Sequence, residues 1–339
     1  MTGSRATAPI ALMSNNPIMT SVVLAALLLL APFACAQQQS QSCVAPHYNI
    51  VSVPLHPTQI NHAGQVSGTT KAHKAALWSQ KHGLHLAPIP AGYVFAEGVG
   101  LNSAGTLIGV VTTEDGSERH AFLFANEKTA LLPGDQSRAT SINDNNEIAG
   151  EARIAGKSAT APVIWRNRVP LDLGACCGGT AFALNNQGQV AGESYDAEGH
   201  YHAFLWNRAH GLKTIGPVDD YSSAAAINNT GQVVIQAFPR TFLYENGKLT
   251  PLDVTPDPMQ PRSLNDCGAI VGSFGKFSDA SKAFIWDQPH GLKDLNDLVA
   301  SATGWKLEVA AGINNRGEIV GWGDYKGEED SGFLLLPQW

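Results

Sequence analysis

Histidines at a repeated position are the first residues of this chain that could do chemistry. His120 and His202 each precede a similar Ala-Phe-Leu segment, and His200 stands two residues before His202, which is a spacing that a metal site could use. A ring of histidines does not follow, because the same position elsewhere holds other residue types: Lys74, Ala161, Arg240, Lys282 and Ser331. We therefore expect no metal ion and no other cofactor.

Aromatic residues near carboxylates form a second group of candidates. An aromatic ring beside a carboxylate suits a sugar or a cationic peptide ligand. Asp219 or Asp220 could also act as a general acid or base. The candidate ligand-binding residues are Tyr93, Phe95, Tyr195, Asp196, Asp219, Asp220, Tyr221, Trp305 and Trp322.

Sequence motifs of known catalytic sites are missing from the chain. There is no GxSxG nucleophile motif, no HExxH zinc motif, no DxDxDG calcium loop, no phosphate-binding GxxxxGK[ST] and no SxDxGxTW aspartate box. A catalytic residue can therefore not be assigned from motifs, although propeller enzymes assemble their sites from scattered loop residues.

A nine-residue repeat shows which elements must position these candidates. Copies of the pattern [IL]NxxGxxxG begin at positions 60, 101, 142, 184, 227, 264 and 313. Each copy reads as two strands around a tight turn, and each is followed by two further short apolar segments, such as AFLW and LKTIG in the fourth copy. A period near 42 with four antiparallel strands per unit predicts a seven-bladed β-propeller.

The two ends of the chain predict how the ring closes. The last repeat stops after GFLLL without a fourth strand, whereas the segment YNIVSVPL, residues 48–55, resembles a fourth strand that has no repeat of its own. We expect this N-terminal strand to complete the last blade, which would hide the two open edges.

The repeated asparagine has a structural explanation. Asparagine at the first position of a β-turn caps the turn backbone, and glycine at the fourth position accepts a left-handed conformation. The residues two and four positions before each asparagine are mostly small, so we expect them to line a narrow central channel. Trp78, Trp165, Trp206 and Trp286 are expected to pack between blades. The turn asparagines are Asn61, Asn102, Asn143, Asn185, Asn228, Asn265 and Asn314.

The first 36 residues predict a secretory signal peptide. An apolar run over residues 22–33 is too short for a membrane span, which needs about 20 residues, and a small-x-small site precedes the cut after Ala36. Met13 or Met19 could be the true start. Cys35 could instead accept a lipid, although Pro32 stands where such sites usually carry leucine. We expect a signal peptide over 1–36, a linker over 37–47 and the propeller over 48–339.

Charge and cysteine content limit the partners. The formal net charge is −7, without a stripe of lysine and arginine, which argues against nucleic acid or an anionic membrane. We expect a monomer, secreted to the periplasm or outside the cell. Disulfides are possible after export, but their pairing among Cys43, Cys176, Cys177 and Cys267 stays open. The adjacent Cys176 and Cys177 could pair only as a strained bond.

The repeats resemble a known group of proteins. HAFLW at His202, the INxxGqVvG turns and the closing LNDLVASATGWKLEVAAGINNRGEIVGWG are similar to the HAF-repeat proteins, which are predicted bacterial extracellular repeat proteins. The resemblance covers roughly residues 48–337 and implies a secreted, propeller-like fold without implying an activity. Ile235 departs from the pattern, because it replaces the final glycine of the motif.

The loops between the second and third strands and between blades are the longest, so a site is expected on the face that carries them. The segment DLNDLVASATGW before the last repeat is expected to form a short helical turn. We expect a non-enzymatic module that binds a glycan or an extracellular protein on this face. The alternative is an extracellular polysaccharide hydrolase or lyase with its site in the same loops. A pair of carboxylates with opposed pKa shifts at the channel mouth would favour the enzyme, and a ring of exposed aromatic residues would favour binding.

Overall fold

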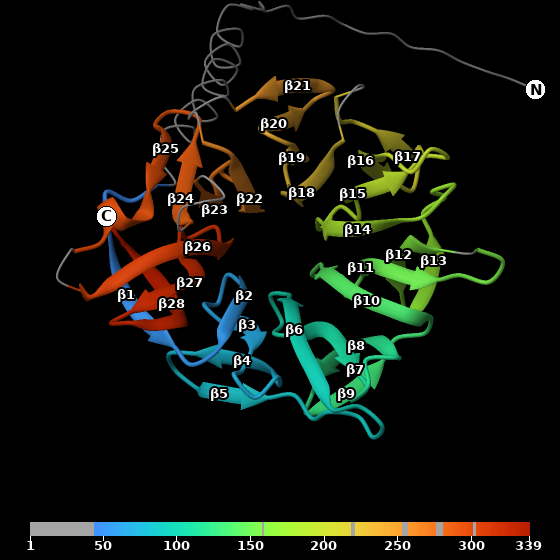
Figure 1. Cartoon of the computed structure of the whole chain (residues 1–339), viewed down its shortest axis with the longest axis horizontal. Coiled ribbons are helices and arrows are strands. Elements are labelled where there is room, and N and C mark those ends of the chain that lie inside the picture. Colours follow the sequence, from blue (N-terminus) through green and yellow to red (C-terminus); the bar gives the residue numbers. More distant parts are fainter. Residues whose placement is uncertain (1–43, 158, 218–220, 253–256, 276–280, 301–302) are drawn as a thin grey trace, which may run out of the picture. The chain divides into compact units, whose positions relative to one another are not determined.

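Seven four-stranded antiparallel sheets surround a central axis, with one strand of each sheet nearest that axis (Figure 1). The computed structural model describes residues 44–157, 159–217, 221–252, 257–275, 281–300 and 303–339, which belong to one compact unit. Its regular structure comprises 28 strands and one short 3₁₀ helix, η1 (Leu295–Leu298). The predicted seven-bladed β-propeller is therefore confirmed.

The bounds of the strands follow the repeats in order. From inner to outer strand, the first four blades are blade 1 (β2 His56–Ile60, β3 Val66–Thr69, β4 Ala75–Ser79, β5 Gly83–Leu86), blade 2 (β6 Phe95–Leu101, β7 Leu107–Thr112, β8 Arg119–Ala125, β9 Lys128–Leu131), blade 3 (β10 Asp135–Ile142, β11 Ile148–Arg153, β12 Thr160–Arg166, β13 Val169–Asp172) and blade 4 (β14 Gly179–Leu184, β15 Val190–Tyr195, β16 Tyr201–Asn207, β17 Gly211–Thr214). The other three are blade 5 (β18 Ser223–Ile227, β19 Val233–Ala237, β20 Arg240–Glu245, β21 Lys248–Pro251), blade 6 (β22 Met259–Leu264, β23 Ile270–Phe274, β24 Lys282–Asp287, β25 Gly291–Asp294) and blade 7 (β26 Trp305–Ile313, β27 Ile319–Tyr325, β28 Glu328–Gln338, β1 His47–Val53).

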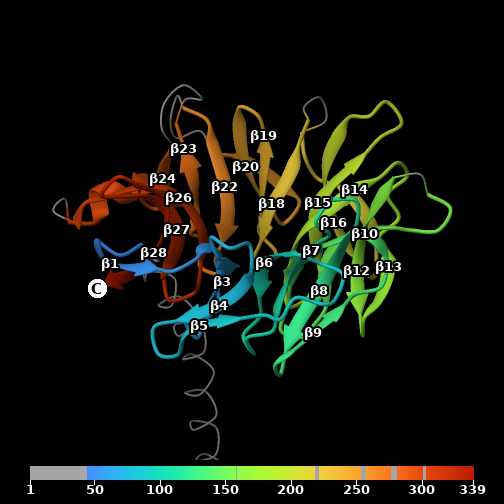
Figure 2. The ribbon, with the colours of Figure 1, turned by 60° about the horizontal axis from the view of Figure 1, so that its bottom comes forward.

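Blade 7 joins the two ends of the chain. Strand β1 pairs antiparallel with β28, in a register that runs from His47 opposite Gln338 to Val53 opposite Gly332. The sheet order β1-β28-β27-β26 makes the first strand of the chain the outer strand of the last blade, as Figure 2 shows from the side. The predicted closure of the ring by the N-terminal strand is confirmed.

The turn that joins the inner strand to the second strand has the predicted chemistry. In blade 4 the Oδ1 atom of Asn185 accepts hydrogen bonds from the backbone N–H groups of Gln187 (3.1 Å) and Gln189 (3.0 Å). The fourth turn position is left-handed, with φ at +72° in Gly188. In blade 3 this position holds Asn146 at φ +58°, which a non-glycine residue accepts best when it is asparagine. The repeated motif is thus a turn that one side chain caps.

The same asparagines also connect the blades, which the sequence did not indicate. Each Nδ2 donates a hydrogen bond to the backbone carbonyl oxygen of the equivalent asparagine in the next blade, at 2.9–3.3 Å, and the seven bonds form a closed circle. All seven side chains are buried. The amide nitrogen is therefore needed for the contact between blades, whereas the turn itself needs only the oxygen.

The central channel is lined only in part as predicted. Every inner strand has a β-bulge between the residues four and two positions before its asparagine, for example between Ala139 and Ser141 in β10. The extra residue in the bulge shifts the alternation of side chains, so Ala139 is buried between blades rather than exposed to the channel. The prediction holds for five of the residues two positions before the asparagines, which do line the channel: Gln59, Ser141, Ala183, Ala226 and Ser263. The residues three positions before the asparagines line it as well: Thr58, Val99, Thr140, Phe182, Ala225, Arg262 and Ala311.

Hydrophobic clusters fill the spaces between neighbouring blades. One cluster joins Ile108 of blade 2 to Ile148 and Trp165 of blade 3. Trp78, Trp206 and Trp286 occupy equivalent buried places in other clusters, so the predicted packing of the four tryptophans between blades is confirmed.

The helical turn predicted before the last repeat is present as η1. Its N-cap residue Asp294 accepts a hydrogen bond from the backbone N–H of Asn296. The side chain of Asn296 then bonds both backbone groups of Leu307, at 2.7 and 2.9 Å, and this fixes η1 against β26. The insertion therefore covers the junction of blades 6 and 7.

Other predictions about the chain ends and cysteines have mixed outcomes. The predicted signal peptide over 1–36, with its cleavage site, lies outside the described residues. Cys43 lies outside them as well. Cys176 and Cys177 are free thiols. Cys267 is in a disulfide bond, and its partner is therefore neither of these two. In the part of the chain that the structure describes, no helix is both long enough and apolar enough to cross a membrane.

Candidate functional site

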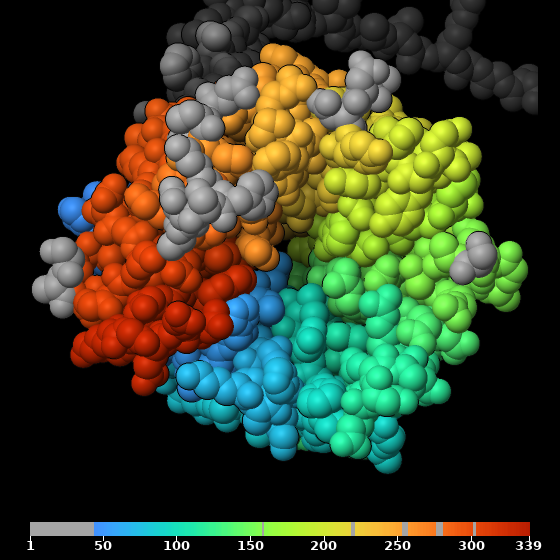
Figure 3. Space-filling view, viewed as in Figure 1, coloured from blue at the N-terminus to red at the C-terminus, as the bar shows by residue number. Residues whose placement is uncertain are grey.

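Two kinds of connection separate the faces of the propeller. The asparagine turns lie at one end of the blades, and we call that end the turn face. The connections between second and third strands and between blades lie at the other end, which we call the loop face (Figure 2). The space-filling view shows a hollow at the centre of the ring, where the seven inner strands converge (Figure 3). The hollow belongs to a channel of about 650 Å³.

Three tyrosines gather on the loop face of blade 4. The ring of Tyr201 lies 6.5 Å from that of Tyr195 and 5.0 Å from that of Tyr221, measured between centroids. All three are exposed, Tyr221 by 52%. Tyr195 ends β15, Tyr201 begins β16 and Tyr221 precedes β18, so a hairpin and the next connection bring the rings together. We call these residues the tyrosine cluster.

A carboxylate and two histidines border the tyrosine cluster. The Oδ2 atom of Asp196 lies 3.2 Å from a ring nitrogen of His200 and 3.2 Å from one of His202. Although burial alone would raise the pKa of Asp196, hydrogen bonds from the His200 N–H and from the two imidazoles lower it. The His200 ring also contacts Tyr221, with centroids 5.2 Å apart. Asp196 is thus an ionised group that holds two imidazoles beside the aromatic rings.

Glu193 stands beside the tyrosine cluster, two residues before Tyr195 in β15. The Tyr195 hydroxyl donates a hydrogen bond of 3.3 Å to the Glu193 carboxylate. Burial raises the pKa of Glu193, and the nearby Glu151 adds to the effect, whereas hydrogen bonds with Ser223 and Tyr195 oppose it. Among the described residues Glu193 makes no ion pair. Its negative charge is therefore less well stabilised than that of Asp196, which lies beside two imidazoles.

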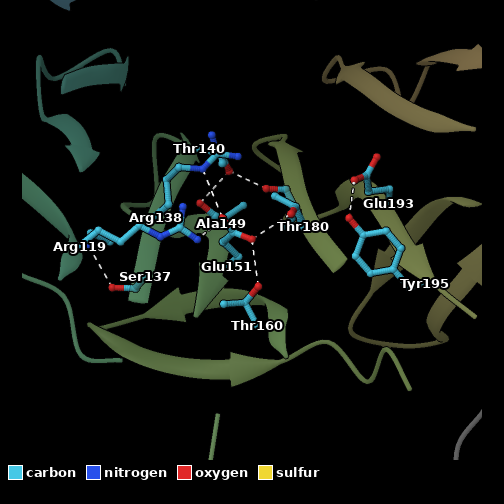
Figure 4. A network of polar contacts seen from close by, with 12 residues as sticks. Arg119, Ser137, Arg138, Thr140, Ala149, Glu151, Thr160, Thr180, Glu193 and Tyr195 are labelled. Carbon is cyan, nitrogen blue, oxygen red and sulfur yellow. Dashed lines mark hydrogen bonds and ion pairs between the residues drawn. The ribbon is translucent and has the colours of Figure 1, made fainter. Parts of the chain in front are cut away.

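Glu151 occupies the same repeat position in blade 3 but has different surroundings. Its Oε1 lies 3.1 Å from Arg119 and 3.5 Å from Arg138, and its Oε2 accepts hydrogen bonds from Thr160 and Thr180 (Figure 4). These partners come from blades 2, 3 and 4, and the side chain is buried. Since every oxygen of Glu151 is satisfied from the protein, this group ties blades together and is not available to a ligand.

The structure separates most of the predicted site residues. Tyr195, Asp196 and Tyr221 come together, but Tyr93 packs half-buried in blade 2 with its ring 5.9 Å from that of His120. Trp305 stacks on Tyr325 in blade 7, and its partner in the prediction, Trp322, lines the central channel. Phe95 lies beside His73 at the start of β6. Asp219 and Asp220 lie outside the described residues, so their predicted role stays a prediction.

Sequence reasoning missed several residues of this face. Glu151 and Glu193 both stand eight positions after their repeat asparagines, so an alignment of the repeats could have found them. Tyr201 could have been found as the residue before the HAF histidine. In blade 4 the thiol of Cys176 also donates a hydrogen bond of 3.3 Å to the Tyr195 carbonyl oxygen. Within the described ranges, no group of three or more histidine, cysteine or acidic side chains could hold a metal ion.

Comparisons with known proteins identify the fold and not a family. No protein-family model matches the chain, and no curated protein matches it. Among solved structures it is similar to virginiamycin B lyase from Staphylococcus aureus, with a TM-score of 0.55, 12% identity, and coverage of 86% of this chain and 100% of that one. It is also similar to the WD40 β-propeller domain of Doa1 (TM-score 0.54, 15% identity, 86% and 97% covered) and to YCF48 bound to D1 peptide (TM-score 0.52, 10% identity, 85% and 94% covered). At these identities the likeness shows the propeller fold alone.

Proposed function

We propose that this protein is an exported, non-enzymatic binding module that recognises a glycan or an extracellular protein through the loop face of blade 4. The observation that carries the proposal is the tyrosine cluster of Tyr195, Tyr201 and Tyr221, which exposes three adjoining rings on a rigid blade. Export and the resemblance to the HAF-repeat proteins are predictions from the sequence, and they favour a ligand outside the cytoplasm.

The physical argument rests on what clustered tyrosines contribute to binding. A tyrosine offers a large amphipathic surface with little side-chain entropy to lose, so it contributes strongly to contacts with proteins and sugars. Asp196 and the imidazoles of His200 and His202 add polar groups at the edge of the rings. A flat aromatic area with hydrogen-bonding groups at its rim suits stacking against a sugar ring or packing against a protein side chain.

Similar propellers support a binding role without establishing it. YCF48, at 10% identity to this chain, was solved bound to a peptide, and the similar domain of Doa1, at 15% identity, is a WD40 domain. Neither comparison names a ligand for this chain, so the ligand has to be found by experiment.

A binding screen with matched variants tests the proposal. Residues 37–339 would be applied to a glycan array and to extracellular protein fractions, with Tyr201→Ala and Tyr221→Ala beside the parent chain. We expect one retained ligand whose binding weakens at least 10-fold in both variants, because each ring contributes about 1–3 kcal/mol. Trp339→Ala, which removes an aromatic ring that is 72% exposed elsewhere, should leave binding unchanged. A ligand that binds both tyrosine variants as tightly as the parent would show that the cluster is not its site.

Glu193 favours a second function, an extracellular polysaccharide hydrolase or lyase. Its carboxyl group has a raised pKa, lies next to a phenol hydroxyl and has no ion-pair partner in the described part of the chain. A raised pKa keeps the proton on a carboxyl group to higher pH, which suits a general acid. The test is release of reducing ends or unsaturated uronates from a polysaccharide panel. Product formation that Glu193→Gln abolishes would establish the enzyme, and retention of a ligand without turnover would support the binding module.

A further inference from the structure

Arg262 is the one charged residue among the seven bulge residues that line the central channel. The other six are Thr58, Val99, Thr140, Phe182, Ala225 and Ala311. The Arg262 side chain is exposed to solvent at the channel wall, where β22 of blade 6 places it. A threonine or alanine would serve the bulge equally well, so the fold does not require a cation at this place.

One aromatic ring lies against Arg262, and a second ring packs on the first. Its guanidinium carbon lies 5.3 Å from the centroid of the Trp322 indole ring, which β27 of blade 7 projects into the channel. The His56 ring, from the start of β2, lies 4.0 Å from Trp322 between centroids, with 37° between the planes. A guanidinium that lies over an indole ring keeps its N–H groups pointing sideways and free to donate. Blade 6 thus supplies the guanidinium, and blades 7 and 1 supply the two stacked rings beside it.

The charge of Arg262 has no carboxylate partner in the described residues. Arg138, which also lines the channel, differs because Glu151 lies 3.5 Å from it. His56 does not supply a second charge near Arg262, because burial and the neighbouring Arg262 lower its pKa, against the opposite effect of Asp330. An arginine of this kind, inside a half-enclosed channel, favours a planar anion that can accept two parallel hydrogen bonds.

An adjoining cavity limits what the rest of the ligand can be. A cavity of about 950 Å³ on the loop face, between blades 7, 1 and 2, shares His56, Thr58 and Val99 with the channel. Its walls include Val53 and Leu55, and it is bordered by three carboxylates against one lysine: Glu97, Glu328, Asp330 and Lys71. These acidic groups repel a polyanion but attract a cationic side chain. The two cavities together fit a ligand with one terminal carboxylate and a neutral or cationic body.

We infer that Arg262, Trp322 and His56 form a binding site for the free C-terminal carboxylate of a peptide, whose preceding basic and apolar residues occupy the outer cavity. A peptide end fits better than an acidic glycan, because repeated uronate groups would meet Glu97, Glu328 and Asp330. The site goes beyond the proposed function, since it uses blades 6, 7, 1 and 2 rather than the tyrosine cluster on blade 4. The two sites can therefore be tested separately.

Titration calorimetry with a matched pair of peptides tests the inference. The purified chain would be titrated with the acetylated tripeptide lysyl-alanyl-leucine as the free acid and as the C-terminal amide. We expect the amide to bind at least 10-fold more weakly, because it cannot accept the charge-assisted pair of hydrogen bonds. Arg262→Gln should weaken binding of the free-acid peptide by the same factor. Arg262→Lys keeps the positive charge but cannot donate two parallel hydrogen bonds, so its affinity for the free acid should lie between those of the parent chain and Arg262→Gln.

Controls separate this site from other causes of lost binding. Arg208→Gln removes an exposed arginine from the turn between β16 and β17 and should leave peptide binding unchanged, as should Tyr221→Ala. In NMR titrations the free acid should raise the pKa of His56 in the parent chain and leave it unchanged in folded Arg262→Gln. Equal binding of acid and amide, or full binding by a folded Arg262→Gln, would overturn the inference. Binding of oligogalacturonate that depends on Arg262, with no peptide binding, would overturn the assignment to a peptide.

Discussion

The Nδ2 atom of Asn314 lies 3.0 Å from the backbone carbonyl oxygen of Asn61, although the two residues are 253 positions apart in the chain. This hydrogen bond closes a circle in which six others join consecutive blades. The ring is thus closed twice, once by this bond on the turn face and once by the pairing of β1 with β28. A residue that caps its own turn through oxygen therefore holds the next blade through nitrogen.

Substitution of one ring asparagine by aspartate separates these two roles. In Asn185→Asp the remaining oxygen can still accept from Gln187 and Gln189, but the donor to the Asn228 carbonyl, 3.0 Å away, is lost. A buried carboxylate then faces a carbonyl oxygen, so we expect a loss of about 2–4 kcal/mol in the free energy of unfolding. Urea denaturation would measure it. Asn185 is a suitable site because its other partner, Gln189, is uncharged.

Asn185→Ala provides the comparison. It removes the turn cap together with the bond between blades, and leaves no buried charge. If turn capping were the only role of the asparagine, the aspartate variant would be nearly as stable as the parent and much more stable than the alanine variant. We expect instead that aspartate is at least as destabilising as alanine. Asn246→Asp, at an exposed turn position, should cost little.

The final glycine of the repeat is needed for a different reason, which is the close approach of the neighbouring strand. A Cβ atom on Gly109 would collide with the carbonyl oxygen of Glu97, at the start of the bulged inner strand. We expect Gly109→Ala to lower the free energy of unfolding by about 2–4 kcal/mol. Gly100→Ala, in the same blade, places its Cβ 3.5 Å from Ile108, which is an ordinary contact, and should change stability by about 1 kcal/mol or less. Chemical denaturation of both variants would show whether backbone approach explains this glycine.

Much of the fold could be predicted because the residues that form the tight turn recur in seven copies of the repeat. The asparagine and glycine of each copy fix the inner hairpin, and the missing fourth strand of the last repeat indicated how β1 closes the ring. The bulge next to Ala139 could not be predicted, since an inserted residue leaves no mark in a pattern of small side chains. Ile235 is buried where six blades carry glycine, and nothing in the described contacts explains how blade 5 accepts it.

The candidate site was harder to predict, because its residues come from different blades. Tyr195 and Tyr221 could be chosen as loop aromatics, but their contact through Tyr201 depends on how blades 4 and 5 stand together. Trp322 was predicted on the loop face and lies in the channel, beside Arg262 from another blade. A single sequence gives the repeat position of each residue and not which neighbour its side chain reaches.

The raised pKa of Glu193 predicts a dependence of stability on pH. Burial keeps the proton on the folded carboxyl group at pH values where the unfolded chain has lost it, so the folded state binds more protons in that range. Stability contributed by this group therefore falls as pH rises from about 4, the ordinary glutamate pKa, through the folded value. Glu193→Gln removes the effect. In urea titrations at pH 4, 5, 6 and 7 the variant should gain stability relative to the parent as pH rises, and a constant difference would contradict the prediction.

Removal of β1 should open the ring. Tyr48 and Val53 are buried against the last blade, and their loss should cost about 3–6 kcal/mol, which lowers the unfolding temperature by on the order of 10 °C. A chain of residues 54–339 would also expose the unpaired edge of β28 and should self-associate. A chain of residues 44–339, which keeps β1, is the control. Both chains carry Cys267→Ser, because Cys267 is in a disulfide with neither Cys176 nor Cys177 and both shortened chains lack the other cysteines. Light scattering and thermal unfolding would compare the two chains. Addition of a peptide with the sequence of residues 47–53 should bring back part of the lost unfolding temperature of the shorter chain and reduce its self-association. A chain of residues 54–339 that stays monomeric with an unchanged unfolding temperature would show that the edge of β28 needs no partner.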